Sequence, residues 1–371
     1  MPTPDSTDPR AARLGPILVT GAFGLVGTAT LRRLLDRGYA VVATDLDLPA
    51  NRRAAQRFSG PDLRVRWADL TDPGQVDTVI GTVAPTHIVH LAAIIPPQCY
   101  RNPRLARAVN VDATASILRA AAALPTPPRF VQASSIAVHG TRNPHRVDGP
   151  LRPDSPIRPV DVYGAHKAEA ERLIRSSPLD WVILRLAAVL SVDLDIAINA
   201  DMLHFQAALP GDGRIQTVDV RDIAVAIDAA LTTSATGEAF LIGGDATHRQ
   251  RHQDVTVAMA DAIGLKNAFP GAKPGNPDKD DDWFATDWVD TERSQQVLGF
   301  QQHSWPVMLD EIRAKAGLLR YLARPAAPLV RLWLQRLSPY RGNRQPFADP
   351  WNAIRPRLGN PYPDDSMERS R

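Results

Sequence analysis

The sequence predicts an α/β protein in which a doubly wound parallel sheet is joined to a smaller C-terminal lobe. Two observations lead to this prediction. From about residue 16, short apolar runs alternate with helical stretches, which is typical of βαβ units. The first run, ILVT, ends in a loop with glycines at 21, 24 and 27 and is followed by a helical stretch. A strand, a glycine loop and a helix in this order are typical of a Rossmann-type fold.

Six apolar runs are nearly continuous, as expected for parallel strands that are buried on both faces. They lie at 16–20, 40–45, 63–70, 86–93, 129–135 and 180–190. Helices are predicted at 25–38, 103–123 and about 160–173. Beyond residue 190 the alternation weakens. There we expect a strand and a helix within 214–231, a strand at 237–244, a helix at 255–265 and a short helix at 290–299 that begins at Asp290 or Thr291.

The composition excludes several classes of protein. The 371 residues include 43 basic and 40 acidic ones and no basic stripe interleaved with aromatics, so nucleic acid is not an expected partner. The single cysteine, Cys99, excludes an intramolecular disulfide, fits a reducing compartment and has no partner at metal-ligand spacing, so no metal is expected. Residues 1–15 are polar and predict a flexible leader rather than a secretory signal. No window approaches the roughly 20 apolar residues of a membrane span, and we predict a cytoplasmic protein.

The glycine loop predicts binding of a dinucleotide. Gly21 permits the tight turn, Gly24 lets the backbone approach a pyrophosphate, and Gly27 allows the helix to pack closely on the strand. The helix N-terminus adds N–H groups and the positive end of the helix dipole. The predicted cofactor contacts in this loop are Gly21, Ala22, Phe23, Gly24, Leu25, Val26 and Gly27.

Asp45 stands at the end of the second predicted strand and favours NAD as the cofactor. A carboxylate about 20 residues after the glycine loop accepts hydrogen bonds from the adenosine ribose and repels a 2′-phosphate. Arg52 and Arg53 keep NADP as the alternative, because they would reach a phosphate if the loop folds back.

Tyr163 and Lys167 are four residues apart in a predicted helix and therefore lie on one face, one turn apart. A free tyrosine titrates near pH 10 and is a poor base at neutral pH. A cation one turn away, together with the positively charged nicotinamide, favours the phenolate and predicts a lowered pKa for Tyr163. Taken alone, the pair equally fits a packed aromatic ring beside a solvated lysine, so its interpretation depends on the rest of the chain.

The spacing TGxxGxxG together with YxxxK resembles the extended short-chain dehydrogenase/reductase family, specifically its NAD-dependent epimerase/dehydratase branch. Further segments match in the family's order over about residues 15–300, among them WADLTD, HLAA, VNVDATASIL, ASSIAVHG and TVDVRDIAVA, the last with Asp222. The resemblance implies that Asp69 and Leu70 meet the adenine and that Asn110 distorts a helix and supports the site. It also implies that Leu91, Ala92 and Ala93 line the cofactor.

The resemblance implies the catalytic roles as well. Ser135, at the end of the fifth strand, would hydrogen-bond the substrate oxygen, although a serine there also suits a turn cap. Tyr163 would be the acid and base, and Lys167 would also hold the nicotinamide ribose. Family dehydratases of nucleotide sugars carry an Asp–Glu pair after the catalytic hydroxyl. Ile136 and Ala137 stand there and cannot transfer protons, so such a dehydratase is not expected.

Three further residues are predicted to contact the substrate: Ser134, His139 and Arg214. Arg214 stands one place from the family's usual diphosphate-contacting arginine, which weakens a nucleotide-sugar interpretation without excluding it. In the lobe, Trp283 and Trp288 either line a pocket or pack the interior.

The predicted organisation is a leader at 1–15, an NAD(P)-binding domain with the catalytic residues at 16–190, and a lobe at 191–318 that mainly binds substrate and returns some segments to the core. A basic, proline-rich extension follows at 319–371. Its stretch LLRYLARPAAPLVRLWLQRL suits either contact with a membrane surface or packing on the body or a second subunit. Pro325 and Pro328 favour the second, because they break a long helix.

The predicted activity is reversible hydride transfer between NAD(P) and a secondary alcohol or ketone, carried out by a homodimer on a small-molecule substrate. Two alternatives stay open: a nucleotide-sugar epimerase with tightly bound NAD, and a non-catalytic NAD(P)-sensing protein. Proteins of the second kind often lack the tyrosine or the lysine, and both are present. The substrate and the direction of reaction are not determined by the sequence.

Overall fold

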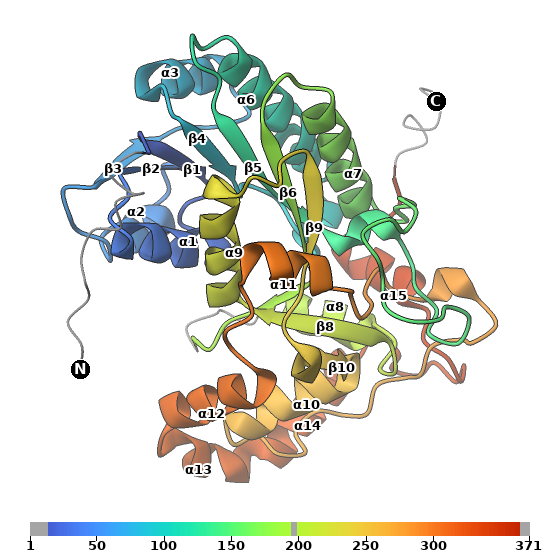
Figure 1. The fold of residues 1–371 in the computed structure, drawn as a ribbon. Helices are drawn as coiled ribbons and strands as arrows, with labels where there is room; N and C mark the ends of the chain where they lie inside the picture. Colours follow the sequence, from blue (N-terminus) through green and yellow to red (C-terminus); the bar gives the residue numbers. More distant parts are fainter. Residues whose placement is uncertain (1–13, 194–198, 364–371) are drawn as a thin grey trace.

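The computed structural model describes residues 14–193 and 199–363. A seven-stranded sheet forms its centre, with strand order β3-β2-β1-β4-β5-β6-β9 and all neighbours parallel (Figure 1). Its strands are β1 (Ile17–Thr20), β2 (Val41–Asp45), β3 (Leu63–Trp67), β4 (His87–His90), β5 (Arg129–Ser135), β6 (Trp181–Leu186) and β9 (Glu238–Ile242). The predicted fold class is confirmed. The strand order reverses between β1 and β4, which opens a crevice at their carboxyl ends.

Helices cover both faces of this sheet because successive side chains of each strand point to opposite sides. On one face, α1 (Leu25–Asp36) and α9 (Val220–Thr232) pack on residues such as Val19. On the other, α3 (Pro73–Val83), α6 (Ala113–Ala122) and α7 (Val162–Arg175) pack on residues such as Leu18. Shorter helices, α2 (Pro49–Ala55), α4 (Gln98–Arg101) and α5 (Pro103–Arg107), lie in the connections.

Two predicted elements are divided in the structure. The helix expected at 103–123 consists of α5, a π-helical turn at Ala108–Asp112 and α6. The strand expected at 180–190 ends at Leu186, and β7 (Ala188–Leu190) leaves the main sheet to pair with β8 (Arg214–Asp219). β8 also pairs with β10 (Arg249–Arg251), so a second, three-stranded sheet lies beyond the carboxyl end of β6. The predicted strand at 237–244 forms β9 and completes the main sheet.

The rest of the chain is mostly helical. It contains α8 (Ala200–Ala208), α10 (His252–Ala262), α11 (Glu292–Leu298), α12 (Trp305–Ala316), α13 (Leu319–Ala323), α14 (Ala327–Leu337) and α15 (Pro350–Leu358). Pro325 lies in the 3-10 turn that separates α13 from α14, so no long continuous helix forms there, as the prolines predict. Trp283 and Trp288 pack the lobe: their indole N–H groups donate to the carbonyls of Asn276 and Gln250 at 2.8 and 3.0 Å.

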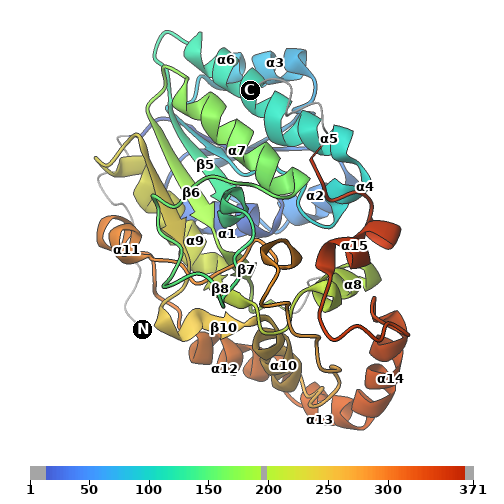
Figure 2. The ribbon, with the colours of Figure 1, turned by 90° about the vertical axis from the view of Figure 1, so that its right-hand side faces the viewer.

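The last described residues pack against the main domain. In Figure 2, α15 lies beside α8, with α13 and α14 at the end of the molecule away from the main sheet. Trp351 and Ile354 of α15 share a buried cluster with Tyr100 and Phe205. The amide of Val162, the first residue of α7, donates to the carbonyl of Pro361 at 2.8 Å. The extension therefore contacts the helix that carries Tyr163.

Two absences concern the described ranges alone. No helix within residues 14–193 or 199–363 is long and apolar enough to cross a membrane. Within the same ranges, no three His, Cys, Asp or Glu side chains gather as metal ligands would. The predicted leader at 1–15 lies outside the described residues except for Leu14 and Gly15.

Candidate active site

The glycine loop joins β1 to α1 at the crevice of the main sheet. Gly21 has a φ of +62°, and a Cβ there would lie 2.7 Å from the backbone nitrogen of Ala92. A Cβ on Gly27 would lie 2.2 Å from the carbonyl oxygen of Gly21. Gly24 is the N-cap of α1, and no side chain caps the helix there. The first turn of a twelve-residue helix therefore points its N–H groups and the positive end of its dipole into the crevice, which fits a dinucleotide phosphate.

Asp45 ends β2 beside this loop. Its carboxylate accepts hydrogen bonds from the amides of Phe23 at 3.0 Å and Leu46 at 2.9 Å and from Asn51 Nδ2 at 3.1 Å. A fixed negative charge at this place suits ribose hydroxyls and disfavours a 2′-phosphate. Of the two arginines that kept NADP as the alternative, Arg52 donates from Nη2 to Asp47 Oδ2 at 2.7 Å, whereas Arg53 is exposed. Both observations favour NAD.

The segment after β4 is held close to the loop. Leu91 and Ala93 line the cavity described below, and the amide of Ala92 lies 3.4 Å from Thr20 Oγ1. Asn110 sits in the π-helical turn, where its Oδ1 accepts from the Ile94 amide at 2.8 Å and its Nδ2 donates to the Ile94 carbonyl at 2.9 Å. It thereby fixes the strand-end loop.

Asp69 and Leu70 follow β3. The Asp69 carboxylate accepts from the amide and hydroxyl of Thr71 at 2.9 and 2.7 Å, and Leu70 is buried in the core. Neither residue lines the cavity described below, so their contact with adenine stays a prediction.

Ser135, Tyr163 and Lys167 come together at the carboxyl end of β5. Ser135 ends that strand beside the phenol of Tyr163 on α7, and its Oγ accepts from the Ala137 amide at 3.2 Å. Lys167 Nζ lies 5.9 Å from the centroid of the Tyr163 ring and donates to the Ala133 carbonyl at 2.8 Å. All three residues line the same cavity as the glycine loop. The serine is therefore both a turn cap and a partner of the tyrosine.

The protonation states of this group follow from burial. Removing water from the phenolate raises the pKa of Tyr163 above its ordinary range, and the hydrogen bond with Ser135 only partly opposes this. This direction is that of the protein alone, and the lowering expected from Lys167 together with a bound, positively charged nicotinamide stays a prediction. Burial also lowers the pKa of Lys167 to about 8, although the nearby Glu171 carboxylate favours the ammonium.

Ser134 and His139, predicted substrate residues, both belong to a buried network around Glu171 and Arg185, and Ser134 also lines the cavity. Ser134 Oγ donates to Glu171 at 2.7 Å, and Arg185 donates to both Glu171 oxygens at 2.9 and 2.7 Å. Arg185 also lies 3.2 Å from His139 Nε2, and His139 Nδ1 contacts the Pro156 carbonyl at 3.1 Å. Burial lowers the pKa of His139 to about 4, so its ring is neutral. His139 is not among the residues that line the cavity, and its contact with the substrate stays a prediction.

The guanidinium of Arg214 is also occupied by contacts within the protein. It donates to the carbonyls of Gly149 and Pro144 at 3.2 and 3.1 Å, and its guanidinium lies 4.8 Å from the ring centroid of Trp288. Arg214 is not among the residues that line the cavity, and its contact with the substrate stays a prediction. Asp222, matched to a family segment, is buried and accepts from the amide of His303 at 3.2 Å, which anchors the segment before α12.

A cavity of about 840 Å³ connects the glycine loop and the catalytic group to the C-terminal lobe. Sequence reasoning missed the residues that line its far side. They come from α8, α10, the segments around residues 270 and 285, and the C-terminal extension, and include Phe205, Gln206, Leu209, His252, Thr256, Phe269, Thr286, Leu334, Leu337 and Tyr340. No motif marks them. Their signal in the sequence is apolar content alone, which core residues share.

The fold and this arrangement of groups define an enzyme of the short-chain dehydrogenase/reductase class. The model of the NAD dependent epimerase/dehydratase family matches residues 17–243, more than half of the chain. The chain therefore belongs to that family, whose description also confirms the predicted cofactor NAD.

Among curated proteins, D-erythronate dehydrogenase of Cupriavidus necator is 31% identical over 184 residues, which cover 47% of this chain and 55% of that protein. UDP-glucuronate 4-epimerase 6 of Arabidopsis thaliana is 31% identical over 169 residues, 42% of this chain and 35% of that protein. The chain thus spans about half or less of these relatives.

Solved structures show the same fold. The Bordetella bronchiseptica enzyme WbmG in complex with NAD and UDP has a TM-score of 0.63 at 21% identity, over 81% of this chain and 93% of that one. The Thermus thermophilus UDP-glucose 4-epimerase in complex with NAD has a TM-score of 0.64 at 24% identity, over 82% and 99%. At these identities the likeness concerns the fold and not the substrate.

Proposed function

We propose that this protein catalyses NAD-dependent hydride transfer at a secondary alcohol or ketone carbon, with Tyr163 as acid and base. The supporting observation is the meeting of Ser135, Tyr163 and Lys167 in one cavity with the N-terminal turn of α1. D-erythronate dehydrogenase, by its name a dehydrogenase, is consistent with this activity.

The roles of the residues follow from their contacts. Ser135 hydrogen-bonds the substrate oxygen and holds it against the phenol of Tyr163. Tyr163 donates its proton to that oxygen when a ketone is reduced and takes the proton back when the alcohol is oxidised. The bound cofactor would supply a hydride to the adjoining carbon as NADH and accept one from it as NAD⁺. The raised pKa of Tyr163 keeps the phenol protonated at neutral pH, which suits reduction. Lys167 holds the ribose and, while charged, favours the phenolate.

Replacing Tyr163 by phenylalanine tests this proposal. Loss of a positioned acid and base lowers the rate by about 10²–10⁴-fold, whereas the affinity for NADH, measured by its fluorescence, stays the same. Tyr362→Phe is the matched control, because this tyrosine is exposed at the C-terminal side and does not line the cavity. Cofactor-dependent turnover by Tyr163→Phe equal to that of the control would disprove the assignment.

The fate of the cofactor distinguishes the proposed dehydrogenase from the alternative, a nucleotide-sugar epimerase. A dehydrogenase consumes exchangeable NADH in proportion to product, whereas an epimerase retains NAD through gel filtration and shows no net reduction.

A homodimer that associates through helices beside α7 is part of the proposal and is tested by sedimentation. A cytoplasmic location is also part of it, and fractionation of the native cells tests that location.

A further inference from the structure

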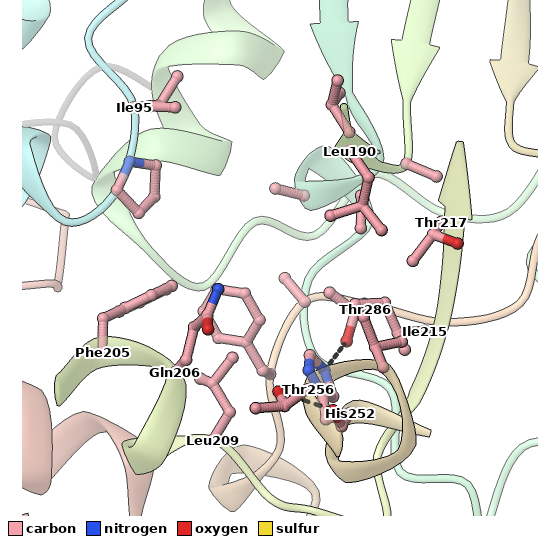
Figure 3. A pocket seen from close by; sticks show the side chains of 18 of the residues that line it. Ile95, Leu190, Phe205, Gln206, Leu209, Ile215, Thr217, His252, Thr256 and Thr286 are labelled. Atoms are coloured by element: carbon pink, nitrogen blue, oxygen red, sulfur yellow. Dashed lines mark hydrogen bonds between the residues drawn. The ribbon is translucent and has the colours of Figure 1, made fainter. Parts of the chain in front are cut away.

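The end of the cavity remote from the glycine loop is apolar. Figure 3 shows Leu190, Phe205, Leu209 and Ile215 turned toward one space, with side chains from β7, α8 and β8. Leu334 of α14 lines the same cavity from the C-terminal extension and is itself buried. This wall lies largely outside the segments that carry the cofactor motifs.

Among the described residues, the cation near this end of the cavity is already held by backbone carbonyls of the protein. Among the described residues that line the cavity, Lys167 and Lys273 are the cations. Lys167 lies at the catalytic end. Lys273 Nζ donates to the carbonyl of Asn343 at 3.2 Å and lies 5.0 Å from the ring centroid of Tyr340. A nucleoside diphosphate needs arginine or lysine donors for its phosphate oxygens, and burying it without them is costly.

The polar side chains at this end are few and mostly satisfied by the protein. His252 Nε2 lies 2.8 Å from Thr286 Oγ1, and burial lowers the pKa of His252 to about 4, so this pair is neutral. Thr256 Oγ1 donates to the His252 carbonyl at 3.3 Å. The amide of Gln206 projects into the space (Figure 3) and offers one uncharged hydrogen-bonding group.

We propose that the substrate is a bulky, uncharged alcohol or ketone with a polycyclic or long-chain apolar body. This inference rests on the proposed function. The reacting oxygen lies at Ser135 and Tyr163, and the apolar body extends between Phe205 and Leu334. The cavity volume is within the range of about 300–1,000 Å³ that is usual for ligand sites.

Reduction of 2-acetylnaphthalene by NADH, compared with binding and conversion of UDP-glucose, tests the substrate class. We expect the ketone to bind the NADH-loaded protein more tightly than UDP-glucose and to be reduced by wild type but not by Tyr163→Phe. Tighter binding of UDP-glucose would overturn the substrate class, as would failure of the ketone to bind. Equal reduction of the ketone by Tyr163→Phe would instead overturn the proposed function, so the two failures are distinguishable.

Two variants locate the binding. Leu337→Gln and Leu334→Glu place polarity or charge in the apolar wall, and we expect ketone affinity to fall at least about tenfold while NADH affinity is unchanged. Leu337 is only half-buried, so its variant is the safer one for folding. Leu105→Gln, at an exposed leucine on α5, is the control. If Leu337→Gln and a folded Leu334→Glu both bind the ketone as tightly as wild type, the ketone does not lie against this apolar wall.

An independent observation concerns the outer side of α13 and α14, which is unusually apolar for a surface. Leu318, Leu322 and Leu329 are 80%, 73% and 71% exposed, and Trp333 is about half exposed. Leu329 and Trp333 are four residues apart and share the outer face of α14. Leu334, on the inner face, lines the cavity, so this helix separates the apolar cavity from the exposed face.

Basic residues are concentrated in this part of the chain, and two of them, Arg313 and Lys315, pair with Asp310 and Asp193. Between Glu311 and Asp349 the chain has basic residues and no acidic ones; they are Arg313, Lys315, Arg320, Arg324, Arg331, Arg336, Arg341 and Arg344. A hollow of about 580 Å³ beside α13 is lined by Lys266, Arg313, Arg320 and Arg324, with Asp261 as its single acidic residue among those described. Exposed leucines and a tryptophan with arginines around them are typical of helices that lie on anionic membranes.

We infer that α13 and α14 bind the surface of an anionic membrane. Their leucines and Trp333 enter the interfacial layer, and the basic hollow faces lipid phosphates. The opposite side of α14 then holds the apolar cavity about one helix diameter, roughly 10 Å, from the lipid.

Flotation with vesicles of phosphatidylcholine alone, or mixed with phosphatidylglycerol, tests this inference. We expect binding to the anionic vesicles that weakens with salt, loss of at least about tenfold in Leu322→Glu/Leu329→Glu, and no loss in Leu105→Glu. Equal binding by the double variant, or no binding by wild type, would overturn it. If wild type does not bind vesicles and the double variant dissociates a wild-type dimer, the face binds a second copy of the chain, and the membrane inference is overturned as well.

Discussion

Replacing Glu171 by glutamine is expected to destabilise the protein strongly, because Arg185 would lose its counter-charge in the interior. The two side chains are each 4% exposed, and two hydrogen bonds of 2.9 and 2.7 Å join them. Ser134 adds a third bond to the same carboxylate. Glutamine keeps the shape and removes the charge, and because its amide nitrogen donates where a carboxylate oxygen accepted, the change also costs one hydrogen bond.

The magnitude follows from burial. Breaking a buried ion pair costs about 3–5 kcal/mol, whereas an exposed pair contributes about 0.2–1 kcal/mol. Asp77 and Arg119 provide the matched control, since their N–O distance is also 2.7 Å but their side chains are 50% and 57% exposed. The two pairs thus share a distance and differ in burial. We therefore expect Glu171→Gln to cost several times more than Asp77→Asn.

This contribution also depends on pH. Burial raises the pKa of Glu171, but Arg185, Ser134 and Arg175 together outweigh this effect and leave the pKa below the ordinary value of 4.5. A carboxylate with a lowered pKa in the folded state stabilises the protein above its unfolded pKa and loses that effect as the pH falls. The difference between wild type and Glu171→Gln should therefore shrink below about pH 4.5.

Urea unfolding followed by tryptophan fluorescence measures these free energies. The double variant Glu171→Gln/Arg185→Met should lose less than the sum of its single variants, because it leaves no unpaired buried charge. A cost for Glu171→Gln no larger than that for Asp77→Asn would refute the reasoning, as would full additivity in the double variant.

Three further predictions follow from the cofactor site. Gly27→Ala would bring a Cβ to 2.2 Å from a backbone oxygen. We expect it to lower the free energy of unfolding by about 1–3 kcal/mol and to weaken NAD binding. Gly81→Ala in α3 is the control, because a Cβ there meets nothing within 4 Å and should leave the free energy of unfolding unchanged or raise it. Burial lowers the pKa of Lys167 to about 8, so NAD affinity should fall above that pH in wild type. In Lys167→Arg the affinity should stay level, because arginine keeps its charge. Identical pH profiles of NAD affinity in the two proteins, measured by titration calorimetry, would contradict the ribose contact. Asp45→Ser should raise the Kd for NAD about tenfold and reduce the preference for NAD over NADP. If the ratio of the Kd values for NADP and NAD is unchanged, Asp45 does not select the cofactor.

Much of the fold could be predicted because its signals are local. Each strand of the main sheet is a short apolar run, and the glycine loop, Asp45 and the Tyr163–Lys167 pair are each recognisable within a few residues. The strand at 180–190 was predicted as one element, since β6 and β7 are equally apolar. Only the pairing of β7 with β8 shows that the chain leaves the main sheet after Leu186.

Contacts between distant segments decided the remaining assignments. His139 and Arg214 carry the right chemistry for substrate contact. In the fold, however, Arg185 and Pro156 hold the first, and Trp288 and two carbonyls hold the second. Whether a guanidinium is free to bind a ligand depends on partners that are many residues away, and spacing in the sequence does not contain that information.

The sequence by itself determined the parallel sheet, the phosphate-binding turn and the helix that carries Tyr163 and Lys167, because each depends on neighbours along the chain. The tertiary structure alone decided what kind of space lies in front of that tyrosine. An apolar residue such as Phe205 or Leu334 has the same signature in the sequence whether it faces the core or a cavity. Only the packing of α8 and α14 around the catalytic end shows that these side chains form an apolar wall.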